Sequence, residues 1–211
     1  MNSLEEIEER VRSCTDCPLS ETRTHAVPGE GSKAARIIFI GEAPGYQEDR
    51  QGRPFVGPAG KFLDELLGSI GLNREDVFIA NMIKCRPPNN RDPLPNEVTA
   101  CTKYLDRQIE LLEPELVVTL GRYAMGKYFP KDSISRVRGR VRTKDGQRVL
   151  PLLHPAAALH QASLRDSIEQ DFQVIPQALR EAREQPLPVS SPPPDGIAAA
   201  ATPPDRQLSM F

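Results

Sequence analysis

The sequence lacks a strong net charge of either sign, and it has no long apolar run. Its 27 lysines and arginines are balanced by 29 aspartates and glutamates, so the formal net charge is -2 over 211 residues. This balance excludes a protein that coats nucleic acid by charge alone, but not an enzyme that touches a few phosphates. No apolar stretch approaches the roughly 20 residues that a membrane-spanning helix requires. We therefore expect no membrane partner.

The sequence also lacks the features of a secretory signal. Its first ten residues are acidic and have a helical pattern, whereas a signal peptide begins with basic residues and continues with an apolar run. We therefore expect a cytoplasmic protein, and in that compartment the four cysteines are not expected to form disulfides. The length suits one well-packed domain, or one domain with a tail.

Short apolar segments alternate with helical patterns along the first 182 residues. Strands are predicted at 36–40, 77–83, 116–120 and 149–153. Helices are predicted at 3–12, 60–70, 95–112, 124–129 and within 158–182. Nearly continuous apolar strands separated by helices are typical of a parallel sheet that is buried on both faces. The fold class is therefore α/β.

The segment 136–142 differs from the other predicted strands because arginine occupies every second position in it, with valine or glycine between. Residues 144–146, Lys-Asp-Gly, supply a hairpin turn before the strand at 149–153. We predict an antiparallel edge strand whose arginines share one face, since charged residues commonly protect sheet edges. A phosphate-binding patch is the alternative interpretation.

Three polar residues follow predicted strands directly or end them. Glu42 follows the first strand, Asn81 lies near the end of the second, and His154 follows the fourth. Ligands of open parallel sheets bind outside the carboxyl ends of the strands, so we expect these three side chains to converge. The loop at 41–61 is rich in glycine and proline, which allow a close approach to a ligand and keep the loop stiff.

The four cysteines form one tight pair and one wide pair. Cys14 and Cys17 make a C-x-x-C motif, whereas Cys85 and Cys101 lie sixteen positions apart in the numbering. Four thiolates could hold zinc or an iron–sulfur cluster, and buried unligated cysteines are the simpler alternative. The wide second pair, with prolines beside two of the cysteines, favours a cubane cluster over a zinc ribbon.

Four motifs, in order, resemble those of the family 4 uracil-DNA glycosylases, the iron–sulfur enzymes that excise uracil. They are GEAPG from Gly41, GRPFVG from Gly52, NMIKC from Asn81 and HPAAAL from His154. The resemblance covers about residues 1–182, and the agreement of several motifs makes it specific. It implies the uracil-DNA glycosylase superfamily fold, a three-layer αβα sandwich around a four-stranded parallel sheet.

The resemblance also implies a cofactor and an activity. The positions of the four cysteines match those of the family's four ligands to a [4Fe–4S] cluster: Cys14, Cys17, Cys85 and Cys101. The activity is DNA repair: uracil is flipped out of DNA and its N-glycosidic bond is hydrolysed, which leaves an abasic site. Uracil-containing DNA is then the partner, and we expect a monomeric protein associated with the nucleoid.

Three residues receive roles toward the extruded base. Phe55 would stack on uracil, although core packing is the simpler reading of a phenylalanine. Asn81 offers a donor and an acceptor, which match O4 and N3–H of uracil but not the reversed pattern of cytosine. His154 would donate to O2 and stabilise the uracil anion as the bond breaks. His25 and His160 receive no role.

The carboxylates of the loop receive less definite roles. Gly41, Glu42 and Ala43 are placed along the uracil, and the Glu42 carboxylate would orient the attacking water or stabilise the sugar cation. Glu48 and Asp49 are further candidates for that role or for excluding the methyl group of thymine. A non-catalytic or covalent uracil-DNA binder is the alternative function. The hydrolytic reading is preferred because the stretch after Lys84 lacks the inserted histidine of the covalent subfamily.

A change of composition after residue 184 divides the chain into three predicted parts. Residues 1–184 form the glycosylase domain with its iron–sulfur site, and residues 185–206 form a disordered tether rich in proline and alanine. Residues 207–211 resemble the pentapeptide that binds the bacterial sliding clamp, with Gln207, Leu208, Met210 and Phe211 as the contact residues. The alternative is a tail end without function.

Overall fold

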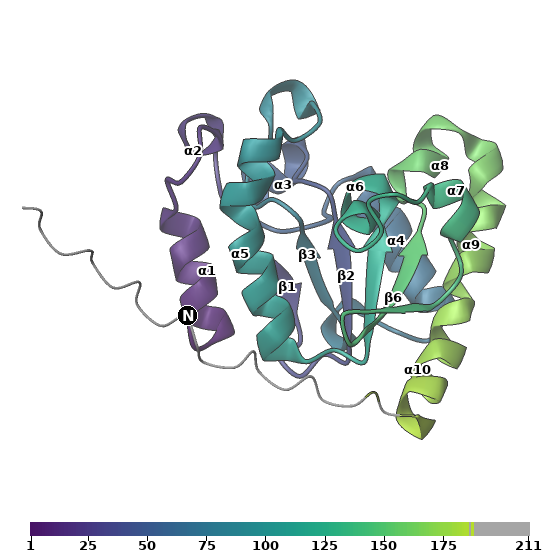
Figure 1. Ribbon diagram of the computed structural model, residues 1–211. Helices are drawn as coiled ribbons and strands as arrows, with labels where there is room; N and C mark the ends of the chain where they lie inside the picture. Colours follow the sequence, from purple (N-terminus) through teal and green to yellow (C-terminus); the bar gives the residue numbers. More distant parts are fainter. Residues whose placement is uncertain (186, 188–211) are drawn as a thin grey trace, which may run out of the picture.

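The computed structural model describes residues 1–185 and residue 187, and in it a single six-stranded sheet forms the centre of the protein (Figure 1). The strand order is β1-β3-β2-β4-β6-β5. The strands are β1 (Glu30–Gly31), β2 (Ile37–Gly41), β3 (Phe78–Asn81), β4 (Leu116–Leu120), β5 (Arg142–Lys144) and β6 (Gln147–Leu152). The four central strands β3, β2, β4 and β6 are parallel, which confirms the predicted four-stranded parallel sheet.

Both edges of the sheet are antiparallel. The β1 strand, which was not predicted, pairs with β3, and β5 pairs with β6. The predicted edge strand at 136–142 is wrong in place: residues Ile134–Val137 form the helix α7, and the edge strand begins at Arg142. Arg138 and Arg142 bind Asp171 and Asp132 in neighbouring segments, and these contacts override the alternation in the sequence.

Helices cover both faces of the sheet because successive strand residues point to opposite sides. Ile38 and Ile40 of β2 pack with residues of α5 (Pro95–Leu112) and α6 (Gly121–Gly126). Ile37 and Phe39 pack on the other face with α4 (Pro58–Ser69), α9 (Arg165–Phe172) and α10 (Val174–Glu184). The result is the predicted αβα sandwich, in which Phe39 stacks on Phe172 with ring centroids 5.9 Å apart.

The remaining helices are short or peripheral. They are α1 (Leu4–Ser13), α2 (Leu19–Thr22), α3 (Tyr46–Gln51), α7 (Ile134–Val137) and α8 (Ala156–His160), with 3-10 turns at Arg74–Asp76, Pro88–Asn90 and Ala162–Leu164. Ser3 caps α1 by accepting the Glu6 N–H, and α1 packs on α5 through Ile7 and Val11. Figure 1 shows α3, α6 and α8 at one end of the sheet, where the parallel strands finish.

The last helix ends at Glu184, which is also the predicted end of the domain. Apart from Gln185 and Leu187, the predicted tether at 185–206 lies outside the described residues, as does the peptide at 207–211. Within the part of the chain that the structure describes, no helix has both the length and the apolar character needed to span a bilayer.

Candidate active site and cysteine pocket

The ends of β2, β3 and β6 meet at one pocket with a volume of about 440 Å³. Gly41, the last residue of β2, is in register with Asn81, the last residue of β3. His154 follows β6 by two residues. Six of the residues that line the pocket are Glu42, Ala43, Glu48, Phe55, Asn81 and His154. The structure therefore brings the predicted base-binding residues to one place.

Phe55 is held in a strained conformation at the wall of the pocket. Its φ of 52° is in the left-handed region, which is unfavourable for a residue with a large side chain. Arg74 stabilises this turn by donating to the Phe55 carbonyl at 3.0 Å and to the Pro54 carbonyl at 2.6 Å. A Cβ atom on Gly60 would lie 1.8 Å from the Phe55 oxygen, so only glycine fits there. The Phe55 ring stacks on the His154 ring at 5.4 Å.

Asn81 presents an unpaired acceptor to the pocket. Its side chain is 2% exposed, and its Oδ1 atom is buried without a hydrogen-bond partner among the described residues. A buried acceptor without a partner costs about 1–3 kcal/mol of folding free energy, so its presence indicates a position where a ligand donor can bind. A Cβ atom on Gly41 would lie 2.3 Å from Oδ1 and 2.7 Å from the Phe55 ring. Gly41 therefore makes room for both binding groups.

His154 is a neutral hydrogen-bond donor in this site. Burial lowers the pKa of His154 from 6.5 to about 4, against an opposing effect of the Glu48 carboxylate. The backbone N–H of Ala156 donates to Nδ1 at 3.1 Å, so the remaining ring proton resides on Nε2. The imidazole can therefore donate from Nε2 at neutral pH, and it can stabilise a developing negative charge without being charged itself.

Glu48 organises the loop that carries Phe55. Its carboxylate accepts the backbone N–H groups of Gly45 at 3.1 Å, Val56 at 2.9 Å and Gly57 at 2.8 Å. The neighbouring Asp49 is 4% exposed and accepts the N–H of Thr24 at 2.8 Å. Because both carboxylates are occupied by main-chain donors, a structural role explains them better than water activation or methyl exclusion.

Glu42 also lines the pocket, but its carboxylate accepts no main-chain N–H group among the described residues. Its side chain is partly buried, and among the described residues it forms no ion pair. Burial raises the pKa of Glu42, as does the nearby Asp92 carboxylate to a smaller extent, while Arg122 opposes the shift. The Glu42 carbonyl accepts the Ile83 N–H at 3.2 Å, which fixes its main chain. Its carboxylate is thus free to contact water or substrate.

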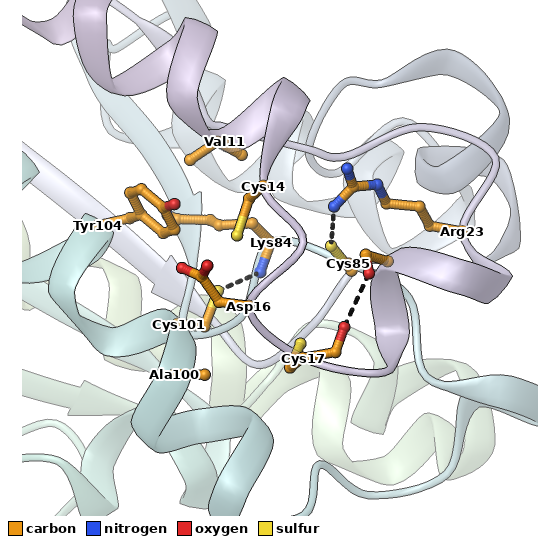
Figure 2. Close-up of a pocket in the computed structure, with 11 residues that line it drawn as sticks. Val11, Cys14, Asp16, Cys17, Arg23, Lys84, Cys85, Ala100, Cys101 and Tyr104 are labelled. Carbon is orange, nitrogen blue, oxygen red and sulfur yellow. Dashed lines mark hydrogen bonds between the residues drawn. The ribbon is translucent and has the colours of Figure 1, made fainter.

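A second, smaller pocket contains the four cysteines (Figure 2). Cys14 directly follows α1, Cys17 lies just before α2, Cys85 follows β3, and Cys101 lies on α5. All four are free thiols. Within the described residues, no three or more His, Cys, Asp or Glu side chains are already close enough together to ligate a metal. The pocket therefore gathers the four predicted ligands without showing a finished ligand shell.

The donors around these sulfurs fit a thiolate site. Figure 2 shows Arg23 pointing at Cys85, and its Nη1 atom donates to the sulfur at 3.1 Å. The backbone N–H of Lys84 donates to the Cys101 sulfur at 3.2 Å. Cations and amides that donate to sulfur stabilise thiolates and tune sulfur-ligated metal clusters. The residues present therefore fit a negatively charged, cysteine-bound group.

Lys84 connects the two pockets, a role that the sequence analysis missed. The side chain is fully buried, and burial lowers the pKa of Lys84 to about 8. Its Nζ atom donates to the Asn81 carbonyl at 3.0 Å and to Gln108 Oε1 at 2.7 Å, while its N–H contacts Cys101. The only signal in the sequence was a lysine placed directly after an apolar strand and before a cysteine.

The comparisons with known proteins agree with this geometry. Residues 28–180 match the family model described as the Uracil DNA glycosylase superfamily. A type-4 uracil-DNA glycosylase from Sulfurisphaera tokodaii is 51% identical, with 83% of this chain and 84% of the relative covered. One from Archaeoglobus fulgidus is 49% identical over 83% of this chain and 92% of its own. One from Thermotoga maritima is 46% identical, with 81% of this chain and 91% of the relative covered.

The αβα sandwich with a polar pocket at the carboxyl ends of its parallel strands defines an α/β protein whose ligand site lies where such sheets usually bind their ligands. The chain belongs to the uracil DNA glycosylase superfamily and, within it, to the type-4 uracil-DNA glycosylases.

His154 should not titrate near neutral pH. In a long-range ¹H–¹⁵N spectrum of the imidazoles, we expect His154 to show the Nε2–H tautomer unchanged from pH 8 to pH 5, because its pKa lies at about 4. Since the pKa of His154 is below its unfolded value, its burial also destabilises the fold progressively as the pH falls from 6.5 toward 4. A His154 titration centred near 6.5 would contradict this assignment.

Proposed function

We propose that the protein is a DNA repair glycosylase that flips uracil out of DNA and hydrolyses its N-glycosidic bond. The products are free uracil and an abasic site. The observation that carries this proposal is the unpaired Asn81 Oδ1, buried at the wall of a pocket that also holds Phe55 and His154. Family membership supports the same activity.

Asn81 and Phe55 bind the flipped base. The Asn81 Oδ1 atom accepts from N3–H of uracil, and the same amide donates from Nδ2 to O4. Cytosine presents a donor at position 4 and an acceptor at position 3, so both buried groups would be unmatched. Phe55 provides a flat surface of fixed orientation, since its main chain is held by Arg74.

His154 and Glu42 assist bond cleavage. As the glycosidic bond lengthens, negative charge moves onto uracil, and the His154 Nε2–H donates to O2 where that charge accumulates. Because this hydrogen bond strengthens as the charge develops, it lowers the barrier rather than only binding substrate. On the opposite side, the Glu42 carboxylate positions water for attack on the electron-poor sugar carbon.

Replacing Asn81 should separate activity from stability. In Asn81→Ala, we expect kcat/KM for uracil release to fall about 100-fold, since two buried hydrogen bonds to the base are lost. The unfolding free energy should change by less than about 1 kcal/mol. The substitution loses packing contacts, but it also removes a buried acceptor that has no partner, and the two effects oppose each other. The measurements are alkaline cleavage of a uracil-containing oligonucleotide and urea unfolding. The control is Asn96→Ala, an exposed asparagine on α5.

The same assay distinguishes the alternatives. Uracil-dependent strand breaks after alkali support hydrolysis by the wild-type protein. Retarded but intact DNA would instead indicate a non-catalytic binder, and a protein–DNA adduct that survives denaturation would indicate a covalent one. Either of these outcomes would overturn the proposed function.

We further propose that Cys14, Cys17, Cys85 and Cys101 hold a [4Fe–4S] cluster. The support is their common pocket, the donors to two of the sulfurs, and the family resemblance. When bound, the cluster supplies a covalent cross-link between α1, the segment after β3, and α5. Its role is structural, because the cysteines line a different pocket from Phe55 and His154.

Metal analysis tests the cluster. Anaerobically purified protein should contain iron and acid-labile sulfide in equal amounts, with a broad visible absorption band. Cys85→Ser should lose the iron and the band and should unfold at a lower temperature, whereas the matched Ser13→Ala should keep all three properties. Stoichiometric zinc in place of iron and sulfide would contradict the assignment.

We also propose that Gln207, Leu208, Met210 and Phe211 bind a bacterial sliding clamp. These residues lie outside the described residues, so the support is the sequence motif alone. Deleting residues 207–211 should abolish clamp affinity in a titration, while uracil release from clamp-free DNA should be unchanged. Equal clamp affinity with and without the peptide would end this proposal. A protein that acts on DNA in this way would be cytoplasmic and associated with the nucleoid.

A further inference from the structure

An aromatic residue and two arginines form an ordered group at one rim of the base pocket. Tyr46 begins α3 and is 49% exposed, which is unusual for a large side chain in this protein. The Arg86 guanidinium lies 5.2 Å from the centre of the Tyr46 ring, and the Arg50 guanidinium lies 5.8 Å from it. Arg50 also donates to the Tyr46 hydroxyl at 3.2 Å. We call Tyr46, Arg50 and Arg86 the rim cluster.

The rim cluster is directly joined to the base pocket. Gly45 precedes Tyr46 and Pro87 follows Arg86, and both of these neighbours line the pocket. Arg86 Nε donates to Asn90 Oδ1 at 2.7 Å, and Asn90 is a third lining residue. A nucleotide whose base occupied the pocket would therefore leave its own backbone close to these guanidinium groups.

The two arginines differ from others around the pocket because no carboxylate neutralises them. Arg91 is paired with the buried Glu97, and Arg122 is paired with Asp92. Within residues 1–185 and 187, neither Arg50 nor Arg86 forms an ion pair; their polar contacts are the Tyr46 hydroxyl and the Asn90 amide. In a chain with a net charge of -2, two uncompensated cations held beside a binding pocket indicate an anionic ligand.

The chemistry of the rim cluster fits a phosphodiester. Arginine binds phosphate through two parallel N–H groups, and a guanidinium that rests on an aromatic face loses less conformational freedom on binding. A cation–π contact at an exposed site contributes a modest attraction, enough to order the side chains without blocking their N–H edges. The tyrosine ring would thus replace the carboxylate that usually orders a surface arginine.

We propose that the rim cluster clamps the phosphate backbone of the strand that carries the uracil, next to the flipped nucleotide. This inference rests on the proposed function. It assigns Arg50 and Arg86 as the phosphate contacts and Tyr46 as the residue that positions them. The clamp supplies affinity for DNA, and the base pocket supplies the choice of base.

The test uses the full-length protein and single-stranded oligonucleotides with one uracil. The variants are Arg50→Ala, Arg86→Ala, the double variant, Tyr46→Leu and Arg86→Lys, with Arg180→Ala as the control. Arg180 is an exposed arginine on α10, away from the pocket, so its replacement changes the net charge as much as Arg50→Ala or Arg86→Ala does. Because Arg86 adjoins Cys85, the Arg50→Ala variant tests the clamp without disturbing the cysteine pocket.

For the double variant, we expect KM to rise about 10-fold with little change in kcat. The plot of log(kcat/KM) against log salt concentration should become less steep by about 0.7 for each arginine removed, the value for a single-strand phosphate contact. Tyr46→Leu should give a smaller rise in KM, and Arg86→Lys should restore the salt slope but not the full affinity. Arg180→Ala should match the wild type.

A neutral backbone locates the contact. A single methylphosphonate beside the uracil should weaken binding of the oligonucleotide to the wild-type protein when it stands at one or two particular positions. The same replacement at those positions should not change the binding of the double variant. Salt slopes that are unchanged in the double variant, or equally changed in Arg180→Ala, would overturn the clamp. Fluorescence anisotropy with an oligonucleotide that contains a stable abasic analogue gives the same slopes without catalysis. A wild type that binds DNA but releases no uracil would therefore refute the proposed function and still test the clamp.

Discussion

The absence of a side chain at Gly41 is the constraint on which the base pocket depends. Parallel pairing of β2 with β3 places Gly41 opposite Asn81, and the loop after β2 returns Phe55 to the same point. Since a methyl group at Gly41 would overlap both Asn81 Oδ1 and the Phe55 ring, the two groups can meet only across a glycine. The register of β2 against β3 therefore determines how Asn81 and Phe55 are placed relative to each other.

Hydrogen bonds from the protein itself orient the groups that line the pocket. Arg74 holds the strained turn at Phe55, Glu48 collects three main-chain N–H groups of the same loop, and the Ala156 N–H fixes the tautomer of His154. The free energy needed to order these groups, and to leave Asn81 Oδ1 unpaired, is met during folding by the two apolar layers around the sheet. In the proposed function, a flipped base meets donors and acceptors that are already oriented, so little binding energy is lost to reorganisation.

Much of this arrangement could be predicted from the sequence because it depends on strong local patterns. Apolar runs located the four parallel strands within a few residues, and the topology rule for such sheets brought Glu42, Asn81 and His154 together. The failures share a cause in contacts and local conformations that the sequence pattern does not show. Arginine alternation at 136–142 gave no sign of the partners Asp171 and Asp132, and α3 was hidden in a stretch that looked like continuous loop. The roles of Glu48 and Lys84 likewise depend on main-chain atoms that only the folded loops bring near.

Lys84 gives the two pockets a common part. Its amide hydrogen points to Cys101, its ammonium group holds the carbonyl of Asn81, and Gln108, which accepts from the same ammonium, is anchored in turn to the Pro28 carbonyl. The cysteine pocket and the base pocket are consequently not interchangeable modules. An attempt to transplant either one into another sandwich of this kind would have to carry the lysine, its glutamine partner and the intervening strand end as a single graft.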